Sequence, residues 1–243
     1  DNNGTPQILA PNILNSKYSG AAWIGITPNS FTIQPAHSQT LNYFIQVPKD
    51  ARPGGHYAAI VYQPLVKENQ NTTGGVVNAQ IGSLFYVTIK GPITEKANVA
   101  KFFANNFNEY GPVKVTTQIK NMGDLHIAPK ATVTVSGLFF KETQNLDTHN
   151  IYPETARDFE NSFGKMLMIG RYKAELIGSY GQENNLPLVA TAYFWVFPWR
   201  VTVVVILIAI ALVLFGQYYQ KKKKKAPKEA HEPKEDGEKA GTE

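Results

Sequence analysis

The chain has 243 residues, with 24 Lys and Arg against 19 Asp and Glu, and a formal net charge of +5. Hydrophobic residues make up 43% and charged residues 18%, which excludes a disordered polyampholyte or a coiled coil. Much of the basic excess lies in residues 200–243, which leaves residues 1–199 nearly neutral and predicts no nucleic-acid partner. The absence of Cys excludes disulfides, thiolate metal sites and cysteine nucleophiles.

The first part of the chain has a β pattern. Apolar residues alternate along residues 41–47, and the runs 57–62 and 84–89 have the Val, Ile, Tyr and Phe content of strands. Turn clusters separate these runs. We expect Gly54 and Gly55 to take positive φ angles in a tight reversal between Val47 and Tyr57.

The second part continues the β pattern. Residues 113–120 alternate, and three further runs have strand composition: 132–135, 172–177 and 188–195. Gly123 is expected to form a turn within the cluster 121–124. Two segments are assigned differently: 94–106 is read as a brief helix, and 153–163 as one or two helical turns.

These patterns predict a mainly β fold, with two immunoglobulin-like antiparallel β-sandwich domains. The strand signals pause at Lys90-Gly91-Pro92 and then resume. We therefore place the first extracellular domain at residues 1–92 and the second at residues 93–197, each near the usual size of such a module.

A transmembrane helix is predicted at residues 198–220. Residues 201–216 contain one polar side chain, Thr202, and no charge. Extension to Tyr219 gives a helix of about 28 Å, close to the ~30 Å hydrocarbon core. Aromatic and basic side chains flank this segment and are the predicted membrane anchors: Trp195, Trp199, Arg200, Tyr218, Tyr219, Lys221, Lys222, Lys223, Lys224 and Lys225.

The five consecutive lysines also predict the orientation. Lysines beside a span are retained on the cytoplasmic side, so we expect residues 1–197 to be extracellular and the partner of the helix to be the lipid bilayer. Residues 221–243 lack large apolar side chains and are expected to form a disordered cytoplasmic tail. An external N-terminus needs an export signal, which we expect to be removed from this chain or to lie outside it.

The sequence offers no catalytic or metal-binding pattern. Its five histidines do not occur at metal-ligand spacing, and no nucleophile-elbow, phosphate-loop or dinucleotide motif is present. Two pairs, Asp124 with His126 and Asp147 with His149, have the spacing of one strand face, but such pairs commonly arise by chance. We therefore predict no enzyme, no cofactor, no metal and no small-molecule substrate.

Two stretches carry a resemblance to a known family. Residues 23–35 with 41–64, and residues 111–113 with 119–135, resemble the extracellular domains of bacterial surface proteins related to the WxL-interacting proteins. The resemblance implies two β-domains, of which the first is associated with peptidoglycan and the second with partner surface proteins. Ala131 stands where Gly is common in that motif, which leaves the partner-binding role open. Relatives also carry strands upstream of the position of Asp1, which leaves open whether the first domain is complete.

Three function classes follow. The favoured one is a membrane-anchored structural or binding module of the cell envelope that holds a cell-wall polymer, another surface protein, or both. The second is an accessory subunit of a membrane complex, although the helix offers no small-residue motif and only Thr202 as a polar contact. The third is a divergent surface hydrolase or a chaperone-like module.

Overall fold

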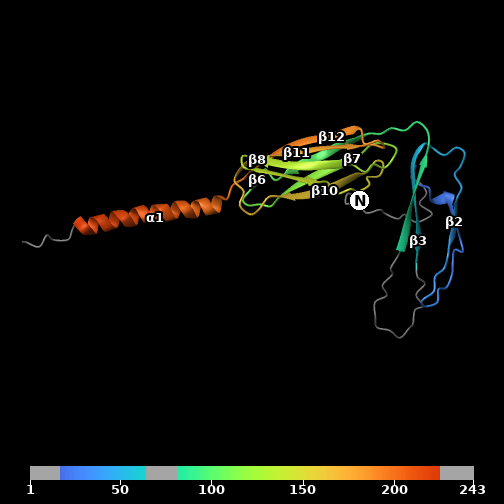
Figure 1. Ribbon diagram of the computed structural model, residues 1–243, viewed down its shortest axis with the longest axis horizontal. Coiled ribbons are helices and arrows are strands. Elements are labelled where there is room, and N and C mark those ends of the chain that lie inside the picture. Colours follow the sequence, from blue (N-terminus) through green and yellow to red (C-terminus); the bar gives the residue numbers. More distant parts are fainter. Residues whose placement is uncertain (1–16, 64–80, 225–243) are drawn as a thin grey trace, which may run out of the picture. The chain divides into compact units, whose positions relative to one another are not determined.

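The computed structural model describes residues 17–63 and 81–224, which are mainly β and end in one long helix (Figure 1). The chain forms two compact units, with the boundary between Phe197 and Pro198. The first unit contains a short 3-10 helix and twelve strands in its described residues: η1 (Ala21–Trp23), β1 (Ile24–Thr27), β2 (Asn42–Ile45), β3 (Gly54–Tyr62), β4 (Ile81–Ile89), β5 (Ala97–Ala104), β6 (Phe107–Asn108), β7 (Val113–Asn121), β8 (Lys130–Gly137), β9 (Phe140–Asn145), β10 (Ala156–Phe163), β11 (Gly170–Tyr180) and β12 (Leu186–Val196).

Strands β5 to β12 form two sheets that share one hydrophobic core. One sheet has the order β10-β7-β5 and the other the order β6-β12-β11-β8-β9; all neighbours are antiparallel except β6 and β12. We call residues 97–196 the two-sheet region. Its core draws on both sheets, with Phe163 and Ile119 from the first and Phe194 and Leu176 from the second.

The alternation in the sequence explains how this core forms. In β7, Val113, Val115 and Ile119 are buried, while Lys114 and Lys120 point to solvent. A strand turns successive side chains to opposite faces, so a period of two places the apolar set on the face that meets the other sheet. The strands predicted around 113–120, 132–135, 172–177 and 188–195 are confirmed.

Strands β1 to β4 form two separate two-stranded antiparallel sheets, β1-β2 and β3-β4. We call residues 17–63 and 81–92 the N-terminal lobe. All four residues of β2 are exposed, and β3 and β4 each carry exposed apolar side chains. Phe44 lies opposite Gly25, and its ring occupies the space that a Cβ at Gly25 would need.

Three local predictions are wrong. Residues 94–106 contain strand β5 and residues 153–163 contain strand β10, in place of the helical turns expected there. Both strands pair with the central strand β7, and this long-range pairing satisfies their backbone groups better than a short isolated helix. The reversal between Val47 and Tyr57 does not join paired strands, because β2 pairs with β1 and β3 with β4.

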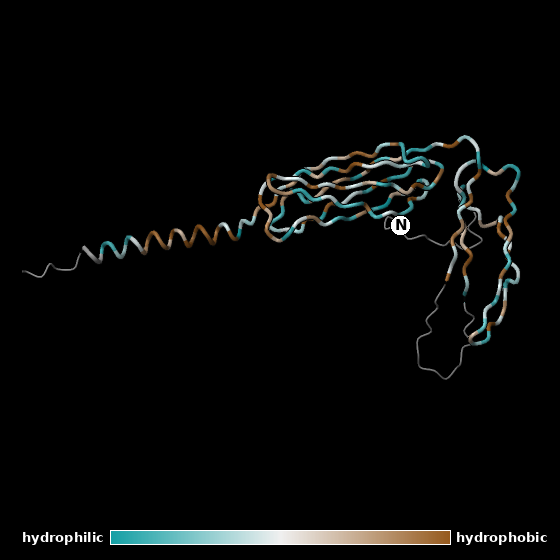
Figure 2. The backbone as a smooth tube through the Cα atoms, in the orientation of Figure 1, coloured by the Kyte–Doolittle hydropathy of each residue, from teal (hydrophilic) through white to brown (hydrophobic). Residues whose placement is uncertain are grey.

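The second unit contains helix α1 (Trp199–Lys224). The most apolar 18-residue window within Trp199–Lys221 has a mean hydropathy of 2.6, and the helix is long and apolar enough to cross a membrane. Figure 2 shows the hydrophobic residues along most of its length. The helix predicted at residues 198–220 is therefore present within one residue of its expected start.

Candidate functional site

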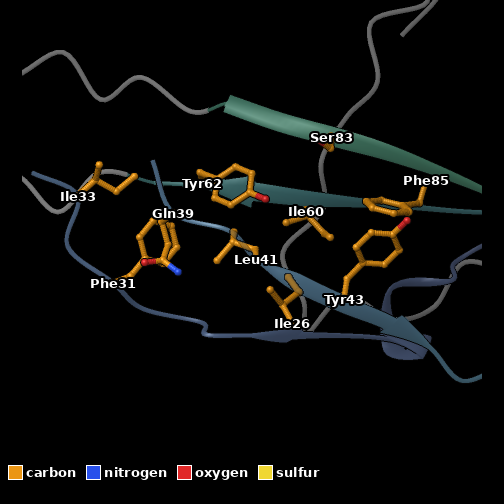
Figure 3. A pocket seen from close by; sticks show the side chains of 10 residues that line it. All are labelled: Ile26, Phe31, Ile33, Gln39, Leu41, Tyr43, Ile60, Tyr62, Ser83 and Phe85. Carbon is orange, nitrogen blue, oxygen red and sulfur yellow. The ribbon is translucent and has the colours of Figure 1, made fainter. Parts of the chain in front are cut away.

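The N-terminal lobe contains an apolar groove between its two small sheets. The groove has a volume of about 400 Å³. Figure 3 shows the side chains that line it, which come from β1, β2, β3, β4 and the segment between β1 and β2: Ile26, Phe31, Ile33, Gln39, Leu41, Tyr43, Ile60, Tyr62, Ser83 and Phe85. Its lining has no carboxylate, imidazole, ammonium or guanidinium group. Recognition in this groove therefore rests on apolar and aromatic contact with a few hydrogen bonds.

Aromatic rings give the groove its shape. Tyr43 of β2 meets Phe85 of β4 edge to face, with ring centroids 5.0 Å apart. Tyr43 is nevertheless 57% exposed, because the two sheets do not close over it. An edge-to-face pair of this kind contributes about 0.5–1.5 kcal/mol beyond the area that it buries, which favours this arrangement of the two rings. The groove is thus preformed and open to solvent.

The backbone edge of β3 lies beside this groove. Tyr57 exchanges both backbone hydrogen bonds with the entering chain, donating to Tyr18 O at 2.7 Å and accepting from Gly20 N at 2.9 Å. Ala59 and Val61 follow Tyr57 along β3 at intervals of two residues, so their N–H and C=O groups point to the same edge as those of Tyr57. Among the described residues, no strand pairs with that edge beyond Tyr57. Such an edge is a template for an added strand.

A cluster of aromatic side chains joins the N-terminal lobe to the two-sheet region. The rings of Tyr57, Tyr86, His126 and Tyr152 lie within 6.0 Å of one another in five contacts. The backbone N–H of His126 donates to the Tyr57 hydroxyl at 2.8 Å, and the same hydroxyl lies 3.2 Å from His126 Nδ1. The hydroxyls of Tyr86 and Tyr152 are 2.7 Å apart. We call these four residues the junction cluster.

Burial sets the protonation of this cluster. It raises the pKa of Tyr57 to about 12 and raises the pKa of Tyr152, because a phenolate would lose its hydration there. Burial also lowers the pKa of His126 below its ordinary value of 6.5. Tyr57, Tyr152 and His126 are therefore neutral at physiological pH, which suits a packing role between two parts of the fold.

Charged side chains surround the junction cluster. Arg52 donates to Asp124 Oδ1 at 2.8 Å, and Asp124 Oδ2 accepts from the backbone N–H of Thr94 at 3.0 Å. The Thr94 bond and the Arg52 guanidinium hold the pKa of Asp124 below its usual value. Lys17 pairs with Glu154 across the same junction. Asp124 thus faces Arg52 and Thr94, so the sequence pair of Asp124 with His126 is not a catalytic dyad.

Among the described residues, the other histidines do not form a reactive group either. His56 is buried against the Trp23 ring, at 4.3 Å between centroids, and its Nε2 lies 2.9 Å from Arg52 O. His149 packs against Phe159, and His231 lies outside the described residues. Across residues 17–63 and 81–224, no group of three His, Cys, Asp or Glu side chains is arranged to hold a metal ion.

The predicted anchor residues flank the apolar helix. Trp195 lies near the end of β12, and Arg200 packs over the ring of Trp199 at 5.5 Å at the start of α1. Tyr219 packs against Phe215 at 5.4 Å near the other end. Tyr218 and Lys221 to Lys224 also belong to α1, whereas Lys225 lies outside the described residues.

The three predicted turn glycines have different roles. Gly54 opens β3 with a φ of +117°, whereas Gly55 and Gly123 do not have positive φ. A Cβ at Gly54 would lie 2.7 Å from Asp124 O, and one at Gly123 would lie 2.6 Å from Thr94 O. Both glycines are therefore required where the chain approaches another backbone segment closely.

Sequence reasoning missed the groove. Its walls come from residues 26–43, 60–62 and 83–85, which are far apart in the chain. Phe31 and Ile33 lie in a segment without regular structure. The one available signal was the set of apolar residues at 31, 33, 41 and 43, which is denser than a short lobe without a third layer can bury.

Comparison with known proteins gives little further information. No protein-family model matches the chain, and no curated protein matches it either. Among solved structures, the alkylpurine DNA glycosylase AlkC of Pseudomonas fluorescens, bound to DNA with an abasic site analog, aligns at 9% identity and a TM-score of 0.34, over 42% of this chain and 30% of that one. A cycloisomaltooligosaccharide glucanotransferase of Paenibacillus sp., complexed with cycloisomaltoheptaose, aligns at 16% identity and a TM-score of 0.36, over 43% of this chain and 14% of that one. The chain thus spans less than a third of either structure, and neither alignment carries an argument about its fold or function.

Proposed function

We propose that this protein is a membrane-anchored extracellular module that binds a partner surface protein or a cell-wall polymer near the membrane. The observation that carries the proposal is the open apolar groove of the N-terminal lobe, in a β unit that continues directly into a helix able to cross a membrane. The groove offers aromatic walls without charged groups, and beside it the described residues leave one edge of β3 unpaired beyond Tyr57. This combination suits an extended segment that adds a strand and places alternate side chains in the groove.

The finer fold assignment belongs to the same proposal. Two sheets that are antiparallel except for β6 and share one core support an immunoglobulin-like sandwich over residues 93–197, and the N-terminal lobe is then part of a second and more open module, proposed over residues 1–92. The resemblance to the WxL-interacting proteins supports the same arrangement of binding domains, helix and lysine-rich tail.

The orientation rests on charge. Lys221 to Lys225 follow the apolar helix, whereas Arg200 is the one basic residue that precedes it closely. The tail is therefore proposed to be cytoplasmic. Protease added to intact cells is expected to digest residues 1–197 and to spare a tail epitope. Loss of the tail epitope with survival of the β unit would contradict this orientation.

The second candidate, an accessory subunit that packs through its helix, has weaker support. Thr202 is the one polar side chain in the central span, and its hydroxyl already donates to Pro198 O at 3.1 Å. A hydroxyl used within its own helix contributes little to helix–helix association. The groove, which lies outside the helix, has no role in this candidate.

The test is a co-sedimentation assay with the full chain in lipid nanodiscs, incubated with purified sacculi or with extracted surface proteins. We compare the double variant Ile33→Gln/Tyr43→Gln, in the groove, with Ile177→Gln/Val189→Gln, two equally exposed apolar residues of β11 and β12. Binding should be lost in the groove variant and retained in the control. Because the groove has no charged lining, raising salt from about 50 mM to about 500 mM should weaken binding only mildly.

Two results would contradict the proposal. If the protein bound neither sacculi nor surface proteins at low salt, the proposal that it is a binding module would be wrong. If the groove variant and the control variant lost binding equally, the groove would not be the binding site.

A further inference from the structure

Five large apolar side chains project from two loops of the two-sheet region. Phe139 is 95% exposed and Leu138 is 85% exposed, at the turn between β8 and β9. Met166, Leu167 and Ile169, between β10 and β11, are each exposed over more than half of their surface. We call these five residues the apolar loop end. Side chains of this size rarely remain in water without a binding role when they occur as a group.

The register of the strands places both loops at one end of the two-sheet region. Gly170, the first residue of β11, lies opposite Val196, the last residue of β12. Ser136, near the end of β8, lies opposite Lys173 of β11, so the β8–β9 turn extends to the level of Gly170. The loop after β10 reaches the segment before β7, where Gly111 N donates to Met166 O at 3.3 Å. Both loops therefore surround the point at which β12 ends.

The opposite end of the same region is different. Its connections follow β7, β9 and β11, and their large apolar residues are turned inward: Leu125, Ile127, Leu146 and Ile151 are all buried. Its exposed positions are polar, among them Asp147, Thr148, His149, Gln182 and Glu183. Among the loops that connect the strands of the two-sheet region, large exposed apolar side chains thus occur at one end and not at the other.

Chain connectivity places the apolar loop end close to the bilayer. Two residues, Phe197 and Pro198, separate the end of β12 from the start of α1. Three chain steps span at most about 11 Å, and the headgroup layer on each side of a bilayer is roughly 5–7 Å thick. Strand β8 lies two strands from β12, or about 10 Å across the sheet. When α1 crosses a membrane, this short connection keeps the apolar loop end within roughly 20 Å of the bilayer surface.

Basic and aromatic residues accompany these apolar side chains. Lys165 and Arg171 are exposed on either side of Met166, Leu167 and Ile169. The Arg171 guanidinium lies 4.5 Å from the centre of the Tyr193 ring, and Arg171 pairs in register with Trp195. Segments 137–141 and 164–171 contain no acidic residue, and Glu142, just beyond the first, accepts a hydrogen bond from Gly164 N at 2.9 Å. Apolar tips with basic and aromatic neighbours match the chemistry of a lipid headgroup layer.

We propose that the apolar loop end inserts into the lipid surface beside the transmembrane helix and holds the two-sheet region against the bilayer. Leu138, Phe139 and Leu167 enter the boundary between headgroups and acyl chains, while Lys165 and Arg171 contact phosphates. The membrane contact of the protein is then wider than one helix. The proposal requires that α1 crosses a membrane, and it is independent of what the groove binds.

The test uses the absence of cysteine from the chain, since any introduced cysteine is a unique labelling site. Phe139→Cys and Leu167→Cys are made in the full chain, labelled with an environment-sensitive fluorophore and reconstituted in nanodiscs with or without spin-labelled phosphatidylcholine. Thr148→Cys and Glu183→Cys, exposed residues of the polar end, are the matched controls. We expect blue-shifted emission and strong quenching by spin-labelled lipid at positions 139 and 167, and neither effect at positions 148 and 183.

Two outcomes would overturn the proposal. One is equal quenching at both ends of the two-sheet region, or at neither end. The other is a label at position 139 that is shielded from aqueous iodide but not quenched by lipid, which would mean that a protein surface covers the loop. Neither outcome tests binding in the groove. The co-sedimentation assay of the groove variant, in turn, does not test contact between the loops and lipid. The two proposals can therefore fail independently.

Discussion

The N-terminal lobe and the two-sheet region contain the same types of β-forming residue but bury them differently. Phe163, in the two-sheet region, is fully buried, whereas Phe44 of β2 is 61% exposed. The difference follows from the number of layers. Two sheets of three and five strands cover each other, while two sheets of two strands leave apolar faces open between them. An apolar face that the fold leaves open is available to a ligand, which is why we place binding in the N-terminal lobe.

Truncation of one phenylalanine in each region provides the largest expected contrast. Phe163→Ala removes a fully buried ring and should cost about 3–5 kcal/mol in the free energy of unfolding. Phe44→Ala removes a largely exposed ring and should cost about 1 kcal/mol or less. Hydrogen exchange with mass spectrometry on the full chain in nanodiscs measures each region separately. Equal costs would mean that the N-terminal lobe has an enclosed core of its own.

The buried polar residue Asn121 tests how tightly the two-sheet region is specified. Its side chain donates to Leu125 O at 2.8 Å and to Ile151 O at 2.9 Å, and accepts from Gly123 N at 2.8 Å. Asn121→Ala removes the side-chain partner of Leu125 O and of Gly123 N, while Ile151 O keeps its bond from Ile127 N at 3.1 Å, and the change should cost about 2–3 kcal/mol. Asn161→Ala is the control, because its bonds are longer and more exposed. A cost for Asn121→Ala no greater than that of the control would contradict the assigned network.

Glycine substitutions compare a buried position of the N-terminal lobe, at its contact with the two-sheet region, with an exposed position in β4. Gly54 has a φ of +117° and lies against Asp124 of the two-sheet region, so Gly54→Ala should cost about 1–3 kcal/mol. Gly82, within β4, lacks a positive φ and has ordinary space for a Cβ, so Gly82→Ala should change stability little. The same exchange measurement decides between them. If Gly54→Ala did not change the free energy of unfolding, the contact between the start of β3 and Asp124 would tolerate movement.

Periodicity alone predicted the two-sheet region well where one face is buried. Alternation in residues 113–120 identified β7 and its core face, because a period of two has one interpretation there. Periodicity did not predict strand β10, in which Phe159 and Phe163 are the buried residues. A spacing of four fits one face of a strand and one face of a helix equally, and pairing with β7, which is not visible in the sequence, decides between them. In β5, a register shift between Val99 and Lys101 interrupts the alternation.

The candidate site was harder to predict than the fold. The groove and the junction cluster both depend on contacts between distant segments, as in the packing of Tyr57 against His126 and Tyr152. Local patterns assign a residue to a strand but not to a neighbour in another sheet. The helix was predictable for the opposite reason, since its length, its hydropathy and its flanking residues are all local properties.

The smallest expected effect is a pH dependence of the junction cluster. His126 is half-buried against the rings of Tyr57 and Tyr86, and burial lowers its pKa below the ordinary 6.5. Well above pH 6.5, the imidazole is neutral whether the junction cluster is closed or open, so His126 has no effect on the equilibrium between the two states. Below pH 6.5, His126 takes up a proton in the open state, whereas burial keeps it neutral in the closed state. The closed state therefore becomes less stable relative to the open state as pH falls.

Asp124 and Arg52 lie nearby, but Asp124 remains charged down to its own lowered pKa and does not contribute in this window. Hydrogen exchange in β3, corrected for its intrinsic pH dependence, should therefore become faster between about pH 7 and about pH 5. The variant His126→Gln should remove this trend, and His37→Gln, an exposed residue of the N-terminal lobe, should retain it. A trend that persists in His126→Gln would assign the pH response to another group and separate it from the contact between the two regions.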